Sequence, residues 1–231
     1  FSTENWNRPK EEVDALMVLL VDTIVKETPT LMKNNVSLQT IGDLSRLPQA
    51  TRDKFLECIQ QTNQNTGLTL VIALSYSARW EIIQAAQHMA QAVQEGTLLP
   101  EDINEETISN YLTTAQVPDP DLLIRTSGEL RISNFLLWQL AYSELYFTNC
   151  LWPDFTNEEF YHAIVDYQHR ERKIRKTSRF QHLLVFLHSN LSMPFYSAST
   201  SSFAFCNLFF SLAISFLYSA SYSSSYSFLN S

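Results

Sequence analysis

Two arginines and a serine that stand close together, Arg125, Arg131 and Ser133, have the residue types of a phosphate-binding loop. Arg125 ends an apolar run, and Gly128 permits a tight turn before Arg131. Arginine forks match pairs of phosphate oxygens, so this segment predicts an oxyanion site. A helix beginning near Ser133 would add free N–H groups to that site. The spacing leaves an alternative open, in which the arginines form ion pairs with Glu129 or other surface acids.

A carboxylate at the start of an apolar run is a second candidate. Glu144 precedes Leu145, Tyr146 and Phe147. A carboxylate among apolar residues is costly unless it is paired or holds a metal. Magnesium favours one or two carboxylates together with substrate phosphate oxygens, so Glu144 is a candidate magnesium ligand. The alternative is an ion pair between Glu144 and one of the two arginines of the preceding segment.

The first nine residues form a third candidate. They are polar and aromatic, and they precede a long helical pattern without sharing its period. Such a segment fits a mobile loop that covers a substrate. The alternative is a capped entry into the helix, with Asn5 or Asn7 near the N-cap.

Alternating helical and strand patterns must position these residues. Apolar spacings predict helices over residues 12–32, 48–64, 78–94, 104–112 and 157–175, and strands near 36–42, 68–74, 121–126 and 144–148. This alternation predicts an α/β fold with a parallel sheet. Ligands of such sheets bind beyond the carboxyl ends of the strands, where the candidate residues of the first segment stand.

Composition narrows the functional classes. The chain has 231 residues, 45% of them apolar, and a net charge of −8, which argues against nucleic-acid binding. Its three cysteines are widely spaced, so neither a zinc site nor a disulfide framework is expected. We expect a reduced, cytoplasmic location.

The charged residues end abruptly. All of them lie at or before Arg179, and residues 180–231 are rich in serine and aromatic residues. We therefore expect one domain over residues 1–179. The tail, residues 180–231, is expected to be disordered or a reading-frame artefact rather than a membrane anchor, because its apolar stretch at 208–218 is short for a membrane span.

The string Phe-Ser-Thr-Glu-Asn-Trp-Asn-Arg-Pro at residues 1–9 resembles the signature loop of the cis-prenyltransferases, the undecaprenyl diphosphate synthase family. Segments at 41–43, 65–70, 125–135, 143–147, 151–155 and 170–172 match that family in unbroken order. The likeness implies the parallel-sheet fold of the family without its first strands. It also implies an enzyme that condenses isopentenyl diphosphate with an allylic diphosphate, such as farnesyl diphosphate, into a longer cis-polyprenyl diphosphate.

The resemblance assigns roles residue by residue. Asn5 and Trp6 match the loop that closes over the reacting pair, and Glu144 matches the residue that places Mg²⁺. The residues that match the isopentenyl diphosphate site are Arg8, Arg125, Arg131 and Ser133. Leu16, Leu19 and Leu20 are candidates for the lining of an apolar product tunnel, with ordinary core packing as the alternative. A homodimer and peripheral membrane contact through the lipid product are also implied.

The sequence departs from the family in its first motif. The family's Asp-Gly-Asn-Gly loop, which binds the allylic diphosphate, has no counterpart within residues 1–231. We therefore expect this chain, as written, to be inactive. A non-catalytic partner subunit is the alternative function, although the retained arginines and Glu144 argue against it.

Overall fold

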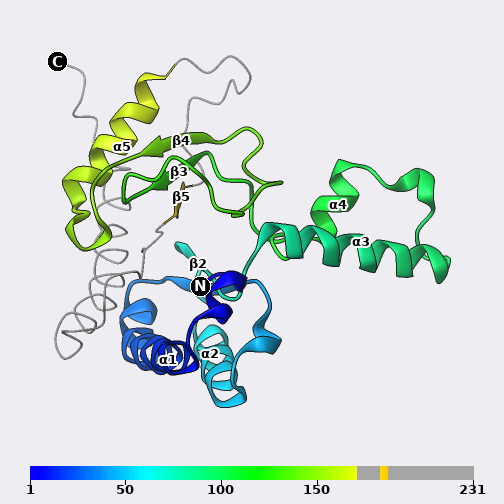
Figure 1. Ribbon diagram of the computed structural model, residues 1–231, viewed down its shortest axis with the longest axis horizontal. Coiled ribbons are helices and arrows are strands. Elements are labelled where there is room, and N and C mark those ends of the chain that lie inside the picture. Colours follow the sequence, from blue (N-terminus) through cyan, green and yellow to red (C-terminus); the bar gives the residue numbers. More distant parts are fainter. Residues whose placement is uncertain (171–182, 187–231) are drawn as a thin grey trace. The chain divides into compact units, whose positions relative to one another are not determined.

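The computed structural model describes residues 1–170 and 183–186, which divide into two compact units (Figure 1). The division falls between Ser75 and Tyr76. Each unit has its own parallel sheet, of two strands in the first unit and three in the second. Each unit is therefore described by itself.

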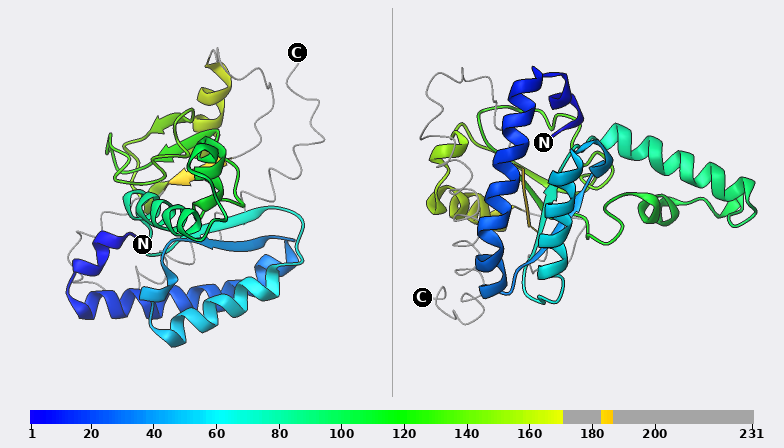
Figure 2. Two further views of the ribbon diagram at one scale, coloured as in Figure 1. Left: turned by 90° about the vertical axis from the view of Figure 1, so that its right-hand side faces the viewer. Right: turned by 90° about the horizontal axis from the view of Figure 1, so that it is seen from below.

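The first unit is a two-stranded sheet with two long helices. Its elements are η1 (Thr3–Asn7), α1 (Lys10–Lys33), β1 (Ser37–Ile41), η2 (Leu44–Arg46), α2 (Gln49–Thr62) and β2 (Thr69–Ala73). The strands β1 and β2 are parallel, with Ser37 opposite Thr69 and Ile41 opposite Ala73. The helices α1 and α2 lie side by side next to the strands (Figure 2).

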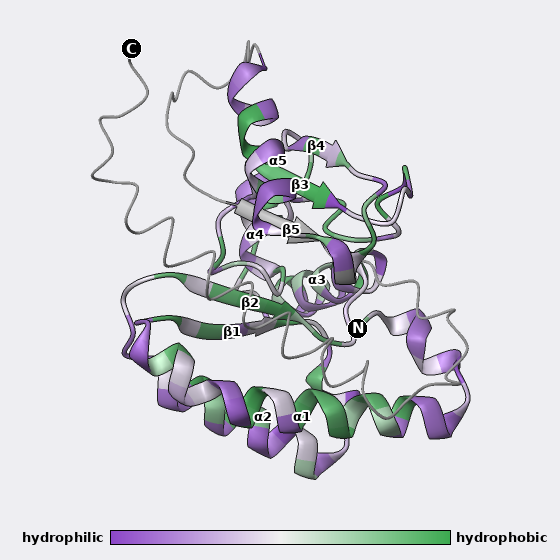
Figure 3. Ribbon diagram, turned by 90° about the vertical axis from the view of Figure 1, so that its left-hand side faces the viewer, coloured by the Kyte–Doolittle hydropathy of each residue, from purple (hydrophilic) through white to green (hydrophobic). Residues whose placement is uncertain are grey.

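Apolar residues at helical spacing explain why α1 lies where it does. Val13, Met17, Ile24 and Leu31 are buried and form one core with side chains from β1 and α2. Figure 3 shows this alternation of apolar and polar stretches along α1 and α2. Burial of such a stripe, rather than intrinsic helix propensity, supplies most of the stability of a helix in a folded protein.

The turn before β1 and the turn before β2 are hydrogen-bonded to each other. Asn35, with φ of 56°, accepts a hydrogen bond of 3.1 Å from the main-chain N–H of Gly67. Its side-chain oxygen accepts another, of 2.9 Å, from the N–H of Thr66. A Cβ atom on Gly67 would lie 2.4 Å from the carbonyl oxygen of Asn35. The close approach therefore requires glycine at position 67.

The second unit contains a helical pair and a three-stranded sheet. Its elements are α3 (Ala78–Gln94), η3 (Pro100–Asp102), α4 (Glu105–Tyr111), β3 (Leu122–Arg125), β4 (Glu144–Phe147), η4 (Trp152–Asp154), α5 (Asn157–His169) and β5 (Leu183–Phe186). The helices α3 and α4 pack on each other, and α5 packs beside β4. The strand order is β4-β3-β5, with all neighbours parallel. Strand β3 has a partner on both sides, and all four of its residues are buried.

The sequence predicted most of these elements. All four expected strands form and pair in parallel, which confirms the α/β fold and rules out an antiparallel sandwich. They belong to two separate sheets, however, rather than to the single four-stranded sheet that was expected. The helix expected over 157–175 ends at His169, and the expected helix near Ser133 is absent. Strand β5 was not anticipated, and it falls inside the segment 180–231. The rest of that segment, and the boundary at residue 179, lie outside the described residues, so both expectations stay predictions.

The contact at Gly67 gives a stability prediction. Gly67→Ala is expected to lower the free energy of unfolding by about 1–3 kcal/mol, because the new methyl group meets a main-chain oxygen that cannot rotate away. Gly96→Asn is the matched control. Gly96 has a φ of 73°, a Cβ atom added to it would meet nothing within 4 Å, and asparagine tolerates that backbone region. Urea unfolding followed by circular dichroism measures both, and equal midpoints for the two variants would contradict the prediction.

Candidate active site

Arg125 occupies the carboxyl end of β3 and is completely buried. Its carbonyl oxygen accepts a hydrogen bond of 2.9 Å from the N–H of Thr148, just beyond β4. The following turn is held to the same segment, because Ser127 N–H donates to Cys150 O (2.8 Å) and Gly128 N–H donates to Thr148 O (2.9 Å). The loop that leaves β3 is therefore fixed by the loop that leaves β4.

The charges around Arg125 confirm part of the ion-pair alternative. Arg131 forms an ion pair with Glu129, while its own side chain remains 65% exposed. Burial lowers the pKa of Arg125, the positive charge of Arg131 lowers it further, and Glu129 opposes both effects. Two guanidinium groups thus stand near one carboxylate, which leaves net positive charge at the end of β3.

Ser133 and Asn134 take a different conformation from the helix start that the sequence suggested. Their φ values are 49° and 58°, which belong to the left-handed region. Asn134 ties this loop to α3, because its carbonyl oxygen accepts from Ala78 N–H (2.9 Å) and its side-chain oxygen from Arg79 N–H (3.0 Å). Its amide group also donates to Ser77 Oγ (2.7 Å). Asn134 was not predicted from the sequence, where its signal was an asparagine in a turn-prone segment.

Glu144 lies at the opposite end of the strands from Arg125. In the register of β3 and β4, Glu144 pairs with Leu122, whereas Arg125 pairs with Phe147. Three residues along a strand correspond to roughly 10 Å. The structure therefore does not place the Glu144 main chain beside Arg125.

The carboxylate of Glu144 has a different partner from those expected. It accepts a hydrogen bond of 2.8 Å from Nη1 of Arg170, at the end of α5. Arg170 also contacts Asp166 through Nε (2.8 Å). Burial lowers the pKa of Arg170, but its hydrogen bonds to Glu144 and Asp166 more than offset this, so the pKa is raised. Within residues 1–170 and 183–186, no three acidic, histidine or cysteine side chains gather as a metal site.

The amino-terminal candidates lie in the first unit. The side-chain oxygen of Asn5 accepts hydrogen bonds from the N–H (2.7 Å) and hydroxyl (2.8 Å) of Ser2. These bonds cap the start of the short helix η1. Trp6 donates from Nε1 to Ser75 Oγ at 2.9 Å. Arg8 lies 3.7 Å from a carboxylate oxygen of Glu12. Because these residues and Arg125 belong to different units, their convergence on one cleft stays a prediction.

The tunnel candidates on α1 are partly buried. Leu16 and Leu20 pack against the core of the first unit, and Leu19 is also half-buried. These contacts agree with the ordinary core alternative, and a role in lining a product tunnel remains a prediction.

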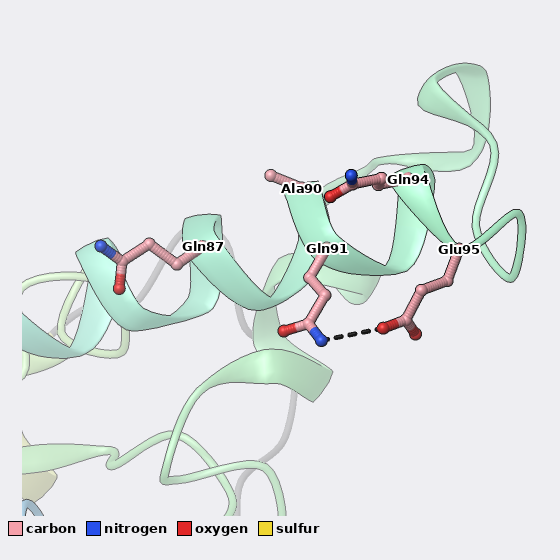
Figure 4. Close-up of a pocket in the computed structure, with 5 residues that line it drawn as sticks. All are labelled: Gln87, Ala90, Gln91, Gln94 and Glu95. Atoms are coloured by element: carbon pink, nitrogen blue, oxygen red, sulfur yellow. Dashed lines mark hydrogen bonds between the residues drawn. The ribbon is translucent and has the colours of Figure 1, made fainter.

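A hollow on α3 lies away from the predicted residues. It is lined by Gln87, Ala90, Gln91, Gln94 and Glu95, and Gln91 donates to Glu95 at 2.8 Å (Figure 4). None of the predicted site residues lines it, so this surface feature does not carry the proposed chemistry.

A buried carboxylate that the sequence analysis did not select supports the second unit. Glu81, on α3, is 1% exposed. It accepts hydrogen bonds from Tyr76 hydroxyl (2.5 Å), from the N–H (2.9 Å) and hydroxyl (2.5 Å) of Thr113, and from Gln139 (3.1 Å). A buried charge with this many donors is well compensated. The signal in the sequence was an acid on the otherwise apolar side of a predicted helix.

A family model described as "Putative undecaprenyl diphosphate synthase" matches residues 1–175. The chain belongs to this prenyltransferase family. An isoprenyl transferase from Porphyromonas gingivalis is 56% identical over 178 residues, which cover 77% of this chain and 70% of that protein. An isoprenyl transferase from Chlorobaculum tepidum is 53% identical over 178 residues, covering 77% and 67%.

Solved structures agree with the family. Lavandulyl diphosphate synthase from Lavandula x intermedia, in complex with dimethylallyl diphosphate, is 38% identical with a TM-score of 0.72, over 74% of this chain and 75% of that one. A protein described as a probable undecaprenyl diphosphate synthase from Campylobacter jejuni is 39% identical with a TM-score of 0.66, over 75% and 79%. These matches confirm the predicted family, its fold and the enzyme class, and they support prenyl-chain elongation as the activity.

Tyr76 gives a prediction for alkaline pH. Burial, followed by the charge of Glu81, raises the pKa of Tyr76 well above its ordinary value of 10. Its contribution to stability is therefore fully present below pH 10 and is lost as the pH rises further, because only the unfolded chain then ionises this group. We expect a loss of about 1.4 kcal/mol per pH unit above pH 10 from this residue.

Tyr76→Phe should remove that part of the pH dependence, as measured by urea unfolding at about pH 9 and pH 11. Tyr142→Phe, at a tyrosine that is 71% exposed, is the matched control and should keep the wild-type pH dependence. The same loss between the two pH values in wild type and Tyr76→Phe would show that Tyr76 does not limit alkaline stability.

Proposed function

We propose that this chain is the isopentenyl-diphosphate-binding part of a cis-prenyl elongating transferase. The reaction joins isopentenyl diphosphate to an allylic diphosphate such as farnesyl diphosphate. The observation that carries the proposal is the loop after β3, in which a buried Arg125 stands near an exposed Arg131. Membership of the prenyltransferase family supports it.

The proposed roles of this loop follow from charge and rigidity. Arg125 and Arg131 would bind the diphosphate oxygens, and the Ser133 hydroxyl would donate to the same group. The ion pair with Glu129 would hold the exposed arginine near the site before substrate arrives. Hydrogen bonds from the loop to Thr148 and Ala78 reduce the ordering that binding requires.

Magnesium is the cofactor proposed for the leaving diphosphate. Glu144 would supply one carboxylate, with water and substrate phosphates as the other ligands, although its main chain lies at the opposite end of β4 from the arginine loop. When bound, the ion would stabilise the charge that develops on the departing diphosphate. Asp166 is a second carboxylate that shares Arg170 with Glu144.

The first unit would protect the reacting groups. Asn5 and Trp6 are proposed to cover the substrates, because an aromatic side chain keeps water from an allylic cation. Arg8 would add positive charge at the same loop. Leu16, Leu19 and Leu20 would line the route of the growing apolar chain. We further propose a homodimer in the cytoplasm that touches membranes only through its lipid product. In the described ranges, no helix is long and apolar enough to cross a membrane.

A partner subunit without catalysis of its own is the second candidate. The observation that favours it is the Glu144–Arg170 ion pair, because a scaffold can use this carboxylate structurally. The two candidates differ in whether the chain binds isopentenyl diphosphate by itself.

Isothermal titration with isopentenyl diphosphate tests the binding proposal. Arg131→Ala should weaken binding by about 10- to 150-fold without changing the melting temperature, because it removes an exposed guanidinium and its one charge-assisted contact of about 1.5–3 kcal/mol. Arg52→Ala, at another arginine paired with a neighbouring acid, is the control and should bind like wild type. Equal affinity for Arg131→Ala and wild type would remove the loop from the site.

Turnover tests the elongation proposal. Residues 1–231 expressed by themselves should not incorporate labelled isopentenyl diphosphate into product with farnesyl diphosphate and Mg²⁺. A chimera that adds the amino-terminal segment of a relative, with its Asp-Gly-Asn-Gly loop, should do so. Arg125→Ala or Glu144→Ala in that chimera should abolish the activity again. Turnover by residues 1–231 alone would show that the Asp-Gly-Asn-Gly loop is dispensable.

A further inference from the structure

The indole ring of Trp6 is held by three neighbours within the first unit. Its Nε1 donates to Ser75 Oγ at 2.9 Å, and Phe1 packs against it edge to face, with ring centroids 5.1 Å apart. The guanidinium carbon of Arg46 lies 5.3 Å from the ring centroid, a cation–π contact. Neither Ser75 nor Arg46 was selected by the sequence analysis.

Ser75 is unusual for a serine. It follows β2, is 1% exposed and has a φ of 51°, a backbone region that non-glycine residues seldom adopt. Its carbonyl oxygen accepts a hydrogen bond of 3.3 Å from Asp43 N–H, just beyond β1. Strained residues that persist at the ends of strands commonly serve a site. Here the strain directs a buried hydroxyl to the indole N–H.

Arg46 approaches the same ring from the end of β1. It closes the short helix η2, whose start is capped by Asp43 through a bond from Ser45 N–H (3.0 Å). The side chain of Arg46 is exposed, so its contact with Trp6 is weaker than the buried hydrogen bond. It still places a positive charge beside the indole ring. The carboxyl ends of β1 and β2 therefore each provide one contact to Trp6.

We propose that Ser75 and Arg46 are positioning residues for Trp6. Together they hold the amino-terminal loop against the carboxyl ends of β1 and β2, where a parallel sheet presents its ligands. This proposal rests on the proposed function, in which Trp6 covers the reacting groups. A purely structural role for Ser75 would concern the turn after β2 and would leave the indole N–H unaffected.

Hydrogen exchange of the indole N–H groups tests the proposal in the full chain. The chain has four tryptophans, so its ¹H–¹⁵N spectrum contains few indole signals, and Trp6→Phe identifies the relevant one. Ser75→Gly removes the hydroxyl and relieves the strained backbone at the same time. We expect the Trp6 indole to exchange up to about tenfold faster in Ser75→Gly, with the other three indole signals unchanged.

Substitution of Arg46 provides a second test of the same proposal. Arg46→Met should speed exchange of the Trp6 indole about twofold to fivefold, whereas Arg46→Lys, which keeps the charge, should stay nearer to wild type. If Ser75→Gly alters all four indole signals, the substitution has disturbed the whole fold. The test then depends on Arg46→Met, which changes only an exposed side chain. Wild-type exchange of the Trp6 indole in Arg46→Met, or in a folded Ser75→Gly, would overturn the proposal.

These readouts need no turnover. If the proposed function fails, titration with isopentenyl diphosphate shows no binding while the indole exchange still responds to Ser75→Gly. If the positioning role fails, the titration is unaffected and the exchange rates do not change. In the active chimera, Ser75→Gly should lower kcat more than it raises KM for isopentenyl diphosphate, because loop position acts on the closed state.

Discussion

The second unit depends on a guanidinium that is kept out of water at the end of β3. A buried charge is costly, and the protein retains it only where the surrounding groups are fixed. The loop after Arg125 meets this condition through bonds from Ser127, Gly128 and Thr148, all made by main-chain groups. Because main-chain groups make these bonds, the loop does not depend on its own side chains for them, although the φ of 69° at Gly128 disfavours a side chain there.

A second buried charge of opposite sign orders the other side of this unit. Glu81 receives donors from the residue before α3's cap, from the loop after α4 and from the loop before β4. Asn134 then joins the start of α3 to the arginine loop. The two buried charges thus help to organise the loops on both sides of β3. Polar networks of this kind favour one arrangement when every donor is satisfied.

The sequence predicted the elements better than the loops. Apolar runs such as 121–126 identify a buried strand directly, and their alternation with helices identifies parallel pairing. The conformation at Ser133 and Asn134 was not predictable, because a positive φ at a non-glycine residue follows from tertiary hydrogen bonds. The partner of Glu144 was missed for a similar reason. Arg170 lies 26 positions away, and nothing in the spacing selects it over nearer arginines.

The Glu144–Arg170 ion pair constrains how this carboxylate could serve the proposed magnesium site. At 2.8 Å the two groups compensate each other's burial, and Asp166 holds the same guanidinium. A divalent cation at Glu144 must therefore replace a bound positive charge. The exchange becomes favourable only when a diphosphate supplies further oxygen ligands and can itself pair with the released guanidinium. Under the proposed function, Glu144 would therefore bind its metal together with the substrate, whose phosphate oxygens would supply further ligands.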